Sequence, residues 1–318
     1  MLEGVGGVYR VRLDAGGTAD CVLRGRLKQD GSSGGRRGRG EPPTPPVDRR
    51  QPRRLVAGDR VRIAPPGDPD APRTIEEVEE RGTELVRASM GGRTRKVVAA
   101  NVDRVAVVVA AARPELRPEL VDRFLVLVET SGLDPLVLVN KVDLAPDGEA
   151  LCRLEERLAA ADVPVLGVSA LSGEGMDALS RILFDGITAL AGPSGVGKST
   201  LLNAVQPGLA LRTGDVSRRQ GRGRHTTVSA RLLELDGGGW VVDTPGFSDV
   251  GLEGVDLAEL PHAWPEFRVR AHDCRFRNCT HLHEPGCAVM EAVQAGEIPR
   301  ERWTSYRDLH GEISEAHS

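Results

Sequence analysis

The tetrapeptide Asn140-Lys141-Val142-Asp143 stands ahead of Gly192-Pro193-Ser194-Gly195-Val196-Gly197-Lys198-Ser199, and Asp243-Thr244-Pro245-Gly246 follows both. A short apolar run ends directly before each motif, at residues 136–139, 187–191 and 240–242. Runs of this kind suit buried parallel strands, and ligands of open α/β sheets bind at the carboxyl ends of such strands. The three motifs are therefore expected to meet at one edge of one sheet.

Residues 192–199 have the pattern of a phosphate-binding loop that opens a helix. Its glycines let backbone N–H groups surround a β-phosphate at a helix N-terminus, where the dipole also favours anions. In this pattern Lys198 bridges the β- and γ-phosphates and Ser199 coordinates magnesium. A plain glycine-rich turn is the alternative reading. The candidate nucleotide-binding residues here are Gly192, Ser194, Gly195, Val196, Gly197, Lys198, Ser199 and Thr200.

The tetrapeptide at residues 140–143 predicts which nucleotide base the protein binds. Asp143 can accept hydrogen bonds from guanine N1–H and from its exocyclic amine, a pair of donors that adenine lacks, and Asn140 and Lys141 complete the motif. Such a site can discriminate by roughly 10⁴-fold, because the wrong base leaves a buried polar group unpaired. Ser169 and Ala170 follow the next apolar run, and the Ala170 N–H is the expected donor to guanine O6. A turn alone would explain four residues, but the combination with a phosphate loop indicates GTP.

The third motif supplies the γ-phosphate sensor. Asp243 is expected to hold magnesium through a water molecule, and the Gly246 N–H to contact the γ-phosphate. Thr227, with Thr226 as the fallback, is expected to reach magnesium from a mobile switch segment. An ordinary GTPase places the phosphate loop first and the guanine loop last. The reversed position of the guanine loop predicts a circularly permuted P-loop GTPase domain.

Catalysis in such a site depends on positioning and charge stabilisation. Many GTPases orient water with a glutamine just after the sensor, but Phe247 occupies that position here. Intrinsic hydrolysis is therefore expected to be slow until another group or a partner assists. His225 is the nearest candidate in sequence, although a histidine in a loop can equally be solvent-exposed. The candidate catalytic residues are His225, Lys198 and Thr227.

The five cysteines predict a metal site. Cys274, Cys279 and Cys287 lie close together, and His281 or His283 would complete a closed tetrahedral zinc set, which is structural rather than catalytic. Three free buried thiols are the alternative. The odd count of cysteines favours metal ligation over disulfides. Cys21 and Cys152 are interpreted as small core residues.

Composition and patterning predict three domains. Residues 1–100 alternate like short strands of a small β-barrel, an OB-fold or another barrel, interrupted at 29–51 by a disordered insertion rich in arginine, glycine and proline. That insertion is either a solvated loop or an RNA-binding arm. Residues 101–256 are predicted to form the GTPase domain, and residues 257–318 are predicted to form a helical zinc-binding domain. The predicted fold class is multidomain α/β.

The bulk numbers fit an ordinary globular chain, with 318 residues, 40% of them hydrophobic, 28% charged, and a net charge of -4. This charge argues against a uniformly basic nucleic-acid coat, and aromatic residues are scarce at 3%. No apolar run is long enough to span a bilayer, and the N-terminus lacks the pattern of a secretory signal. We therefore expect a cytoplasmic protein.

The motif order, Gly223-Arg224-His225-Thr226-Thr227, the sensor and the segment from Cys274 to Cys287 together resemble the RsgA family of circularly permuted GTPases. The resemblance covers nearly the whole chain. It implies an N-terminal OB-fold, a C-terminal zinc domain with Cys274, Cys279, His281 and Cys287 as ligands, and His225 as the proposed catalytic switch histidine.

The resemblance also implies binding to the small ribosomal subunit and its rRNA late in assembly, with the subunit stimulating hydrolysis of GTP to GDP. We expect a monomer with no membrane partner. A second hypothesis is a nucleotide-gated RNA-binding protein in which hydrolysis is incidental. A membrane-bound signalling GTPase is disfavoured, because the chain shows no lipidation motif and no basic amphipathic helix.

Overall fold

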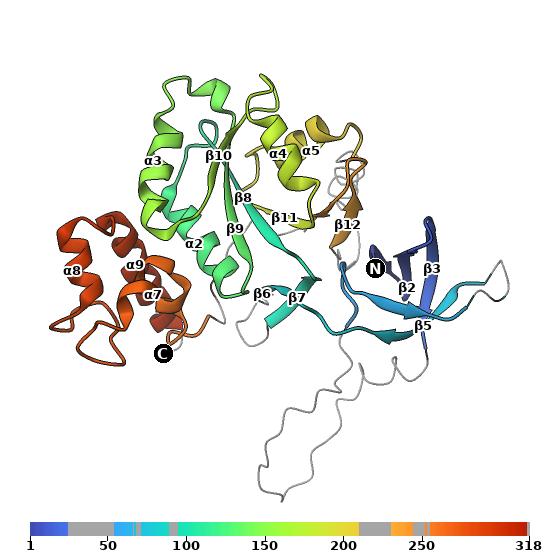
Figure 1. Cartoon of the computed structure of the whole chain (residues 1–318), viewed down its shortest axis with the longest axis horizontal. Coiled ribbons are helices and arrows are strands. Elements are labelled where there is room, and N and C mark those ends of the chain that lie inside the picture. Colours follow the sequence, from blue (N-terminus) through green and yellow to red (C-terminus); the bar gives the residue numbers. More distant parts are fainter. Residues whose placement is uncertain are drawn as a thin grey trace, which may run out of the picture.

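The structure is a computed structural model that describes residues 1–24, 54–65, 67, 71–88, 95–209, 230–243, 252 and 255–316. It contains a central six-stranded sheet covered by helices, a β-structure formed by described residues within 1–100, and a cluster of helices at the C-terminal end (Figure 1). The predicted insertion at 29–51 lies outside the described residues. No helix in the described part of the chain is both long and apolar enough to cross a membrane.

The central sheet carries the ends of all three nucleotide motifs. Its strands are parallel except for the edge strand β12, which runs antiparallel to β13. The strand order across the sheet is β10 (Val165–Val168), β9 (Asp134–Asn140), β8 (Arg104–Ala110), β11 (Ile187–Ala191), β13 (Trp240–Asp243) and β12 (Arg231–Glu234).

Helices cover both faces of this sheet. Alternate residues of a strand point to opposite faces, and on β8 the side chain of Val107 joins one core cluster while that of Val108 joins another. The first cluster includes Phe124 of α2 and Leu154 of α3, and the second includes Leu179 of α4. The helices are α2 (Pro118–Glu129), α3 (Glu149–Leu158), α4 (Met176–Leu183) and α5 (Lys198–Val205), with short 3₁₀ turns at Val142–Leu144 and Ala159–Ala161.

The N-terminal residues form a five-stranded sheet of the kind expected for an OB-fold. All neighbouring strands are antiparallel except β3 and β5, which are parallel. Val11, Cys21, Leu55 and Ile75 form its small core. The order is β1 (Glu3–Val5), β2 (Val8–Arg12), β3 (Thr18–Leu23), β5 (Arg73–Val78) and β4 (Val61–Ile63), and a separate hairpin follows with β6 (Glu84–Ala88) and β7 (Arg95–Ala100).

The N-terminal sheet contacts the edge of the central sheet at β12. The backbone N–H of Leu232 donates to the carbonyl oxygen of Leu2 at 2.9 Å. Two ion pairs flank this bond, Arg231 with Glu3 at 2.8 Å and Arg12 with Glu234 at 3.0 Å. These contacts cover part of an edge whose backbone groups would otherwise be open to pairing with another chain.

The C-terminal helices pack around an aromatic core. Trp264, Phe267 and Tyr306 are buried, with ring centroids 5.5 Å apart for Trp264–Phe267 and 4.9 Å apart for Phe267–Tyr306. Edge-to-face and offset ring pairs of this kind stabilise a core beyond the area they bury. The elements are a 3₁₀ helix at Leu260–Ala263, α7 (Pro265–Ala271), α8 (Ala288–Ala295) and α9 (Arg300–Ala316).

A buried ionic network joins these helices to α2 and α3, which pack on the central sheet. Arg302 of α9 lies 2.6 Å from both Asp122 of α2 and Glu266 of α7, and Arg157 of α3 lies 2.6 Å from Asp122. The Arg302 guanidinium also stacks on the Trp264 ring, 4.1 Å from its centroid. Burial alone would lower the pKa of Arg302, but Asp122 and Glu266 hold it above the ordinary value. Removing one member of such a network leaves buried charges uncompensated.

The predicted multidomain α/β fold class is confirmed, and the strand expected at 187–191 is β11 without change. Cys21 is buried as expected. The interpretation of Cys152 as a core residue is wrong, because this thiol is exposed on α3. Helical periodicity places Leu151, Leu154 and Leu158 on the inner face of α3, and Cys152 follows Leu151 directly, so its side chain points away from that face.

Candidate nucleotide site and metal centre

The phosphate loop connects β11 to α5, as the sequence predicts. Gly192 has φ +132°, and a Cβ built on it would lie 2.1 Å from the carbonyl oxygen of Val108. Gly197 has φ +99°, and a Cβ there would lie 2.4 Å from Asn140 Nδ2. Only glycine fits both positions, since each combines a left-handed backbone with a close neighbour. The loop therefore packs tightly against β8 and the tetrapeptide.

Lys198 and Asp243 belong to one half-buried site at the end of the central strands. The Lys198 ammonium donates to the carbonyl oxygens of Gly192 at 2.6 Å and Pro193 at 2.9 Å. Burial lowers the pKa of Lys198 and raises the pKa of Asp243, while the attraction between the two groups opposes both shifts. An anion beside the lysine and a cation beside the carboxylate would favour the charged form of each.

The tetrapeptide at 140–143 is hydrogen-bonded directly to the phosphate loop. The Asn140 side-chain amide donates to the carbonyl oxygen of Val196 at 2.7 Å. The Lys141 ammonium donates to the carbonyl oxygen of Gly195 at 2.7 Å and also to that of Arg113. The structure thus brings Asn140 and Lys141 to the loop that contains Lys198, although β8 separates their strands in the sheet.

Asp143 is positioned by the segment that follows β10. The Ser169 hydroxyl donates to Asp143 Oδ1 at 2.5 Å, and it accepts from the backbone N–H groups of Leu171 at 3.2 Å and Ser172 at 3.0 Å. Ser169 is buried, whereas Asp143 stays partly exposed. The loop with Ser169 and Ala170 therefore lies beside the carboxylate that the sequence assigns to the base. The motif alone did not reveal this hydrogen bond, through which the Ser169 hydroxyl orients Asp143.

Several predicted site residues lie outside the described part of the chain. They are Thr226, Thr227 and His225 of the switch segment, and Gly246 and Phe247 beyond the sensor strand. Gly192, Ser194, Ser199 and Thr200 are described, at the phosphate loop and the first turn of α5. Their roles, and those of the residues outside the described ranges, remain predictions from the motifs.

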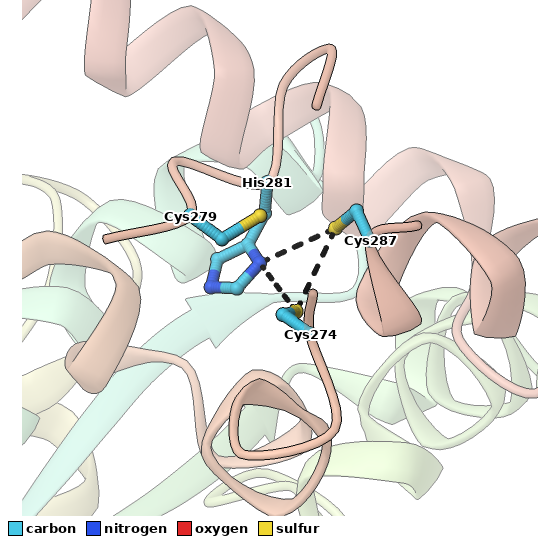
Figure 2. A group of neighbouring side chains, drawn as sticks. All are labelled: Cys274, Cys279, His281 and Cys287. Atoms are coloured by element: carbon cyan, nitrogen blue, oxygen red, sulfur yellow. Dashed lines mark hydrogen bonds between the residues drawn. The ribbon is translucent and has the colours of Figure 1, made fainter. Parts of the chain in front are cut away.

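The four predicted metal ligands converge on one space between α7 and α8 (Figure 2). Cys274 Sγ lies 3.6 Å from His281 Nδ1, Cys287 Sγ lies 3.4 Å from the same nitrogen, and the two sulfurs are 4.0 Å apart. With metal–sulfur bonds of ~2.3 Å, the edges of a tetrahedral zinc site would be roughly 3.8 Å long. All four ligand atoms lie within 4.8 Å of one another, so the donor set fits such an ion. His283 is exposed and outside the cluster, which selects His281.

Burial shifts the pKa values of two of the thiols and of the imidazole in opposite directions. Burial raises the pKa of Cys279 to about 12 and raises that of Cys287, while burial lowers the pKa of His281. A neutral imidazole is a ready ligand, whereas each thiol has to release its proton to bind a cation. Metal binding at this cluster is therefore coupled to the release of protons.

The loop from Cys279 to Glu284 is held from two sides. The Glu284 carboxylate accepts from Thr280 N at 2.9 Å, Thr280 Oγ1 at 2.5 Å, and the backbone N–H groups of Leu282 and His283, both at 3.2 Å. From α9, Trp303 Nε1 donates to the carbonyl oxygen of His281 at 2.8 Å. His281 itself has φ +59°, a conformation that such contacts must maintain. Glu284 is therefore a positioning residue for the ligand loop.

Two solved structures resemble this protein in overall fold. YjeQ from Thermotoga maritima superposes with a TM-score of 0.76 at 32% identity, over 98% of this chain and 96% of that chain. YloQ, described as a circularly permuted GTPase, gives 0.71 at 26% identity, over 99% of this chain and 94% of its own. A phosphate loop joined to a tetrapeptide that precedes it in the chain, on this sheet, defines a circularly permuted P-loop GTPase.

The family model described as RsgA GTPase matches residues 78–253. A protein of Gemmatimonas aurantiaca named small ribosomal subunit biogenesis GTPase RsgA is 40% identical over 314 residues, which is 98% of this chain and 96% of that protein. One of the same name from Geobacillus kaustophilus is 42% identical over 263 residues, 82% of this chain and 85% of its own length. The chain belongs to the RsgA GTPase family, as the motif order predicts.

Proposed function

We propose that this protein binds the small ribosomal subunit and hydrolyses GTP during late maturation of that subunit. The observation that carries the proposal is the direct hydrogen bonding of the 140–143 tetrapeptide to the phosphate loop, through Asn140 and Val196. It supports one pocket that reads both guanine and phosphates. The choice of partner is based on the relatives at 40% and 42% identity, which are named small ribosomal subunit biogenesis GTPases.

The geometry supports the following residue roles, which we propose. Asp143, oriented by Ser169, accepts hydrogen bonds from the guanine edge, and the Ala170 N–H donates to O6. Lys198 leaves the carbonyl oxygens of its own loop and binds the β- and γ-phosphates. Exchanging neutral carbonyl partners for phosphate oxygens pairs the ammonium with anionic acceptors, which adds ion pairing to the hydrogen bonds.

Magnesium would be held by Ser199, Thr227 and, through water, Asp243, and when bound it would neutralise charge on the phosphates. Phe247 replaces the water-orienting glutamine of many GTPases. We therefore assign water positioning to His225 and expect the subunit to bring the switch segment into place. Zinc is the ion we assign to Cys274, Cys279, His281 and Cys287.

The proposed domains correspond to the three parts of the fold. We propose an RNA-binding domain at residues 1–100 with an insertion at 29–51, the permuted GTPase domain at 101–256, and the zinc-binding domain at 257–318. The barrel and zinc domain would hold rRNA while the nucleotide state switches affinity. We propose a cytoplasmic monomer that has no membrane partner.

The test is GTP turnover with and without purified small subunits. We expect slow intrinsic hydrolysis and a large increase on addition of subunits, and His225→Ala should remove most of that increase while leaving GTP affinity intact. Turnover that does not change with subunits would contradict the proposal. Single-turnover kinetics on the complex would separate this enzyme from a nucleotide-gated binder, in which hydrolysis would not limit release.

A further inference from the structure

The loop between the first two metal ligands is a candidate contact surface. Arg275, Phe276, Arg277 and Asn278 separate Cys274 from Cys279, and all four side chains are exposed. The loop lies between α7 and α8, at the end of the molecule farthest from the N-terminal sheet (Figure 1). None of these residues belongs to the nucleotide site or to the ligand set.

Phe276 differs from the other aromatic side chains that the structure describes. Its residue is 45% exposed, and it is the only aromatic among the large hydrophobic residues that the described part of the chain exposes. The neighbouring Trp264, Phe267 and Tyr306 are buried in the aromatic core. One exposed apolar side chain is common on protein surfaces, so its surroundings decide whether it has a role.

Those surroundings are cationic. The Arg275 guanidinium lies 5.5 Å from the centroid of the Phe276 ring, and Arg277 follows on the other side in sequence. The structure shows neither arginine within salt-bridge distance of a carboxylate among the described residues. By contrast, Arg268 pairs with Glu129 at 2.8 Å and Arg270 pairs with Glu297. The acidic neighbour Asp273 faces His272 at 3.4 Å.

The ends of the loop are fixed. Cys274 and Cys279 belong to the metal cluster, and the Arg275 backbone N–H donates to the carbonyl oxygen of Gly286 at 2.9 Å. A short loop held at both ends loses little conformational entropy when its exposed side chains bind. The phenyl ring and two guanidinium groups are therefore presented from a rigid base.

We propose that the 275–278 loop is an RNA contact in which an unpaired base stacks on Phe276 while Arg275 and Arg277 bind the adjacent phosphates. Bases offer a π-face and phosphates offer negative charge. These match an exposed ring with Arg275 beside it and the exposed Arg277 next in sequence, neither arginine forming a salt bridge among the described residues. Protein interaction sites are typically marked by an exposed apolar patch larger than one ring. The inference rests on the proposed function, because the small subunit supplies the RNA.

The test measures affinity for purified small subunits in the presence of a non-hydrolysable GTP analogue. We expect Phe276→Ala and Phe276→Leu to weaken binding by about tenfold or more, as loss of one stacked base does, and Phe276→Trp to retain binding. Phe276→Leu distinguishes RNA from protein, because leucine keeps an apolar contact but has no aromatic face. Retained binding by Phe276→Leu together with loss by Phe276→Ala would indicate a protein contact and overturn the proposal.

The arginines are tested by salt dependence. Arg275→Gln and Arg277→Gln should each lower the slope of log affinity against log salt by about 0.7, the value for one phosphate contact on a single strand. Arg181→Gln, an exposed arginine on α4, is the matched control and should leave the slope unchanged. Zinc content and thermal melting confirm that each variant is folded. Unchanged affinities and slopes with normal wild-type binding would refute this inference alone, whereas failure of the wild type to bind subunits would refute the proposed function.

Discussion

The side-chain amide of Asn140 donates to the carbonyl oxygen of Val196 across 2.7 Å, and this bond joins two loops that follow different strands. β9 and β11 both lie next to β8, so the loops at their carboxyl ends are neighbours in space. This contact depends on the positions of the strands in the sheet and not on the order of the loops along the chain. A permuted chain can therefore build the same pocket, provided that the parallel strands keep their positions.

Lys198→Ala should abolish most of the GTP turnover. The ammonium is the one cation that the phosphate loop contributes, and loss of a comparable transition-state donor costs about 100- to 1,000-fold in kcat. Single-turnover hydrolysis with subunits present measures this effect. Arg181→Ala on α4 is the control and should hydrolyse GTP at the wild-type rate. A Lys198→Ala protein that retains turnover would remove the lysine from the mechanism.

Removing the metal should unfold the C-terminal helices before the central sheet. Cys287 is part of the same buried cluster as Trp264 and Tyr306, so loss of the ion disturbs the aromatic core directly. Structural zinc contributes about 10–16 kcal/mol to small metal-dependent folds. Near-UV circular dichroism during chelation measures the loss of aromatic packing, and far-UV circular dichroism follows the rest of the fold.

Matched cysteine variants provide the control for that experiment. Cys279→Ser removes a ligand and should reproduce the chelated state, with zinc content falling toward zero. Cys152→Ser changes an exposed thiol on α3 and should keep both the metal and the spectrum. Metal-free protein with an unchanged near-UV spectrum would show that the cluster does not support the fold.

Glu284→Ala should weaken metal binding although Glu284 is not a ligand. Its carboxylate holds Thr280, Leu282 and His283 of the ligand loop, and loss of comparable supporting groups lowers metal affinity about 10- to 100-fold. Competition with a chromogenic chelator measures the affinity. The exposed Glu315 of α9 gives the matched control, Glu315→Ala, which should bind metal normally. Equal affinities for the two variants would count against a positioning role.

Arg302→Met should destabilise the protein by about 3–5 kcal/mol, because Asp122 and Glu266 would remain buried with their main partner removed. Urea unfolding followed by far-UV circular dichroism measures the change. Arg307→Met on the same helix removes an exposed arginine that pairs with Asp308, and it should change stability by less than about 1 kcal/mol. Similar losses in both variants would mean that the network does not hold the helices to the central sheet.

The sequence predicted the parts of the molecule whose chemistry is local. The phosphate loop needs glycine at 192 and 197, and those glycines are visible in the chain. The cysteine spacing likewise indicated the metal cluster, although it could not separate His281 from His283. That choice depends on which imidazole the fold buries, and only the packing of α7, α8 and α9 determines it.

Long-range contacts were not predictable. Asp122, Arg157 and Arg302 are far apart in sequence, and each reads as a surface charge on an amphipathic helix until the helices are packed. Ser169 is recognisable as part of a motif, but its hydrogen bond to Asp143 requires the pairing of β9 with β10. Cys152 shows the opposite error, since a residue type that is usually buried lies on the exposed face of its helix.

Asp143 is the proposed reader of guanine, in a pocket shared with Lys198. The most direct test is the affinity of Asp143→Asn for GTP and xanthosine triphosphate, measured by fluorescence of labelled nucleotides beside the wild type. Asparagine can donate to the oxygen that xanthine carries in place of the guanine amine. We therefore predict a loss of GTP affinity and a gain for the xanthine nucleotide. An unchanged preference for GTP would contradict the assignment and place the base elsewhere.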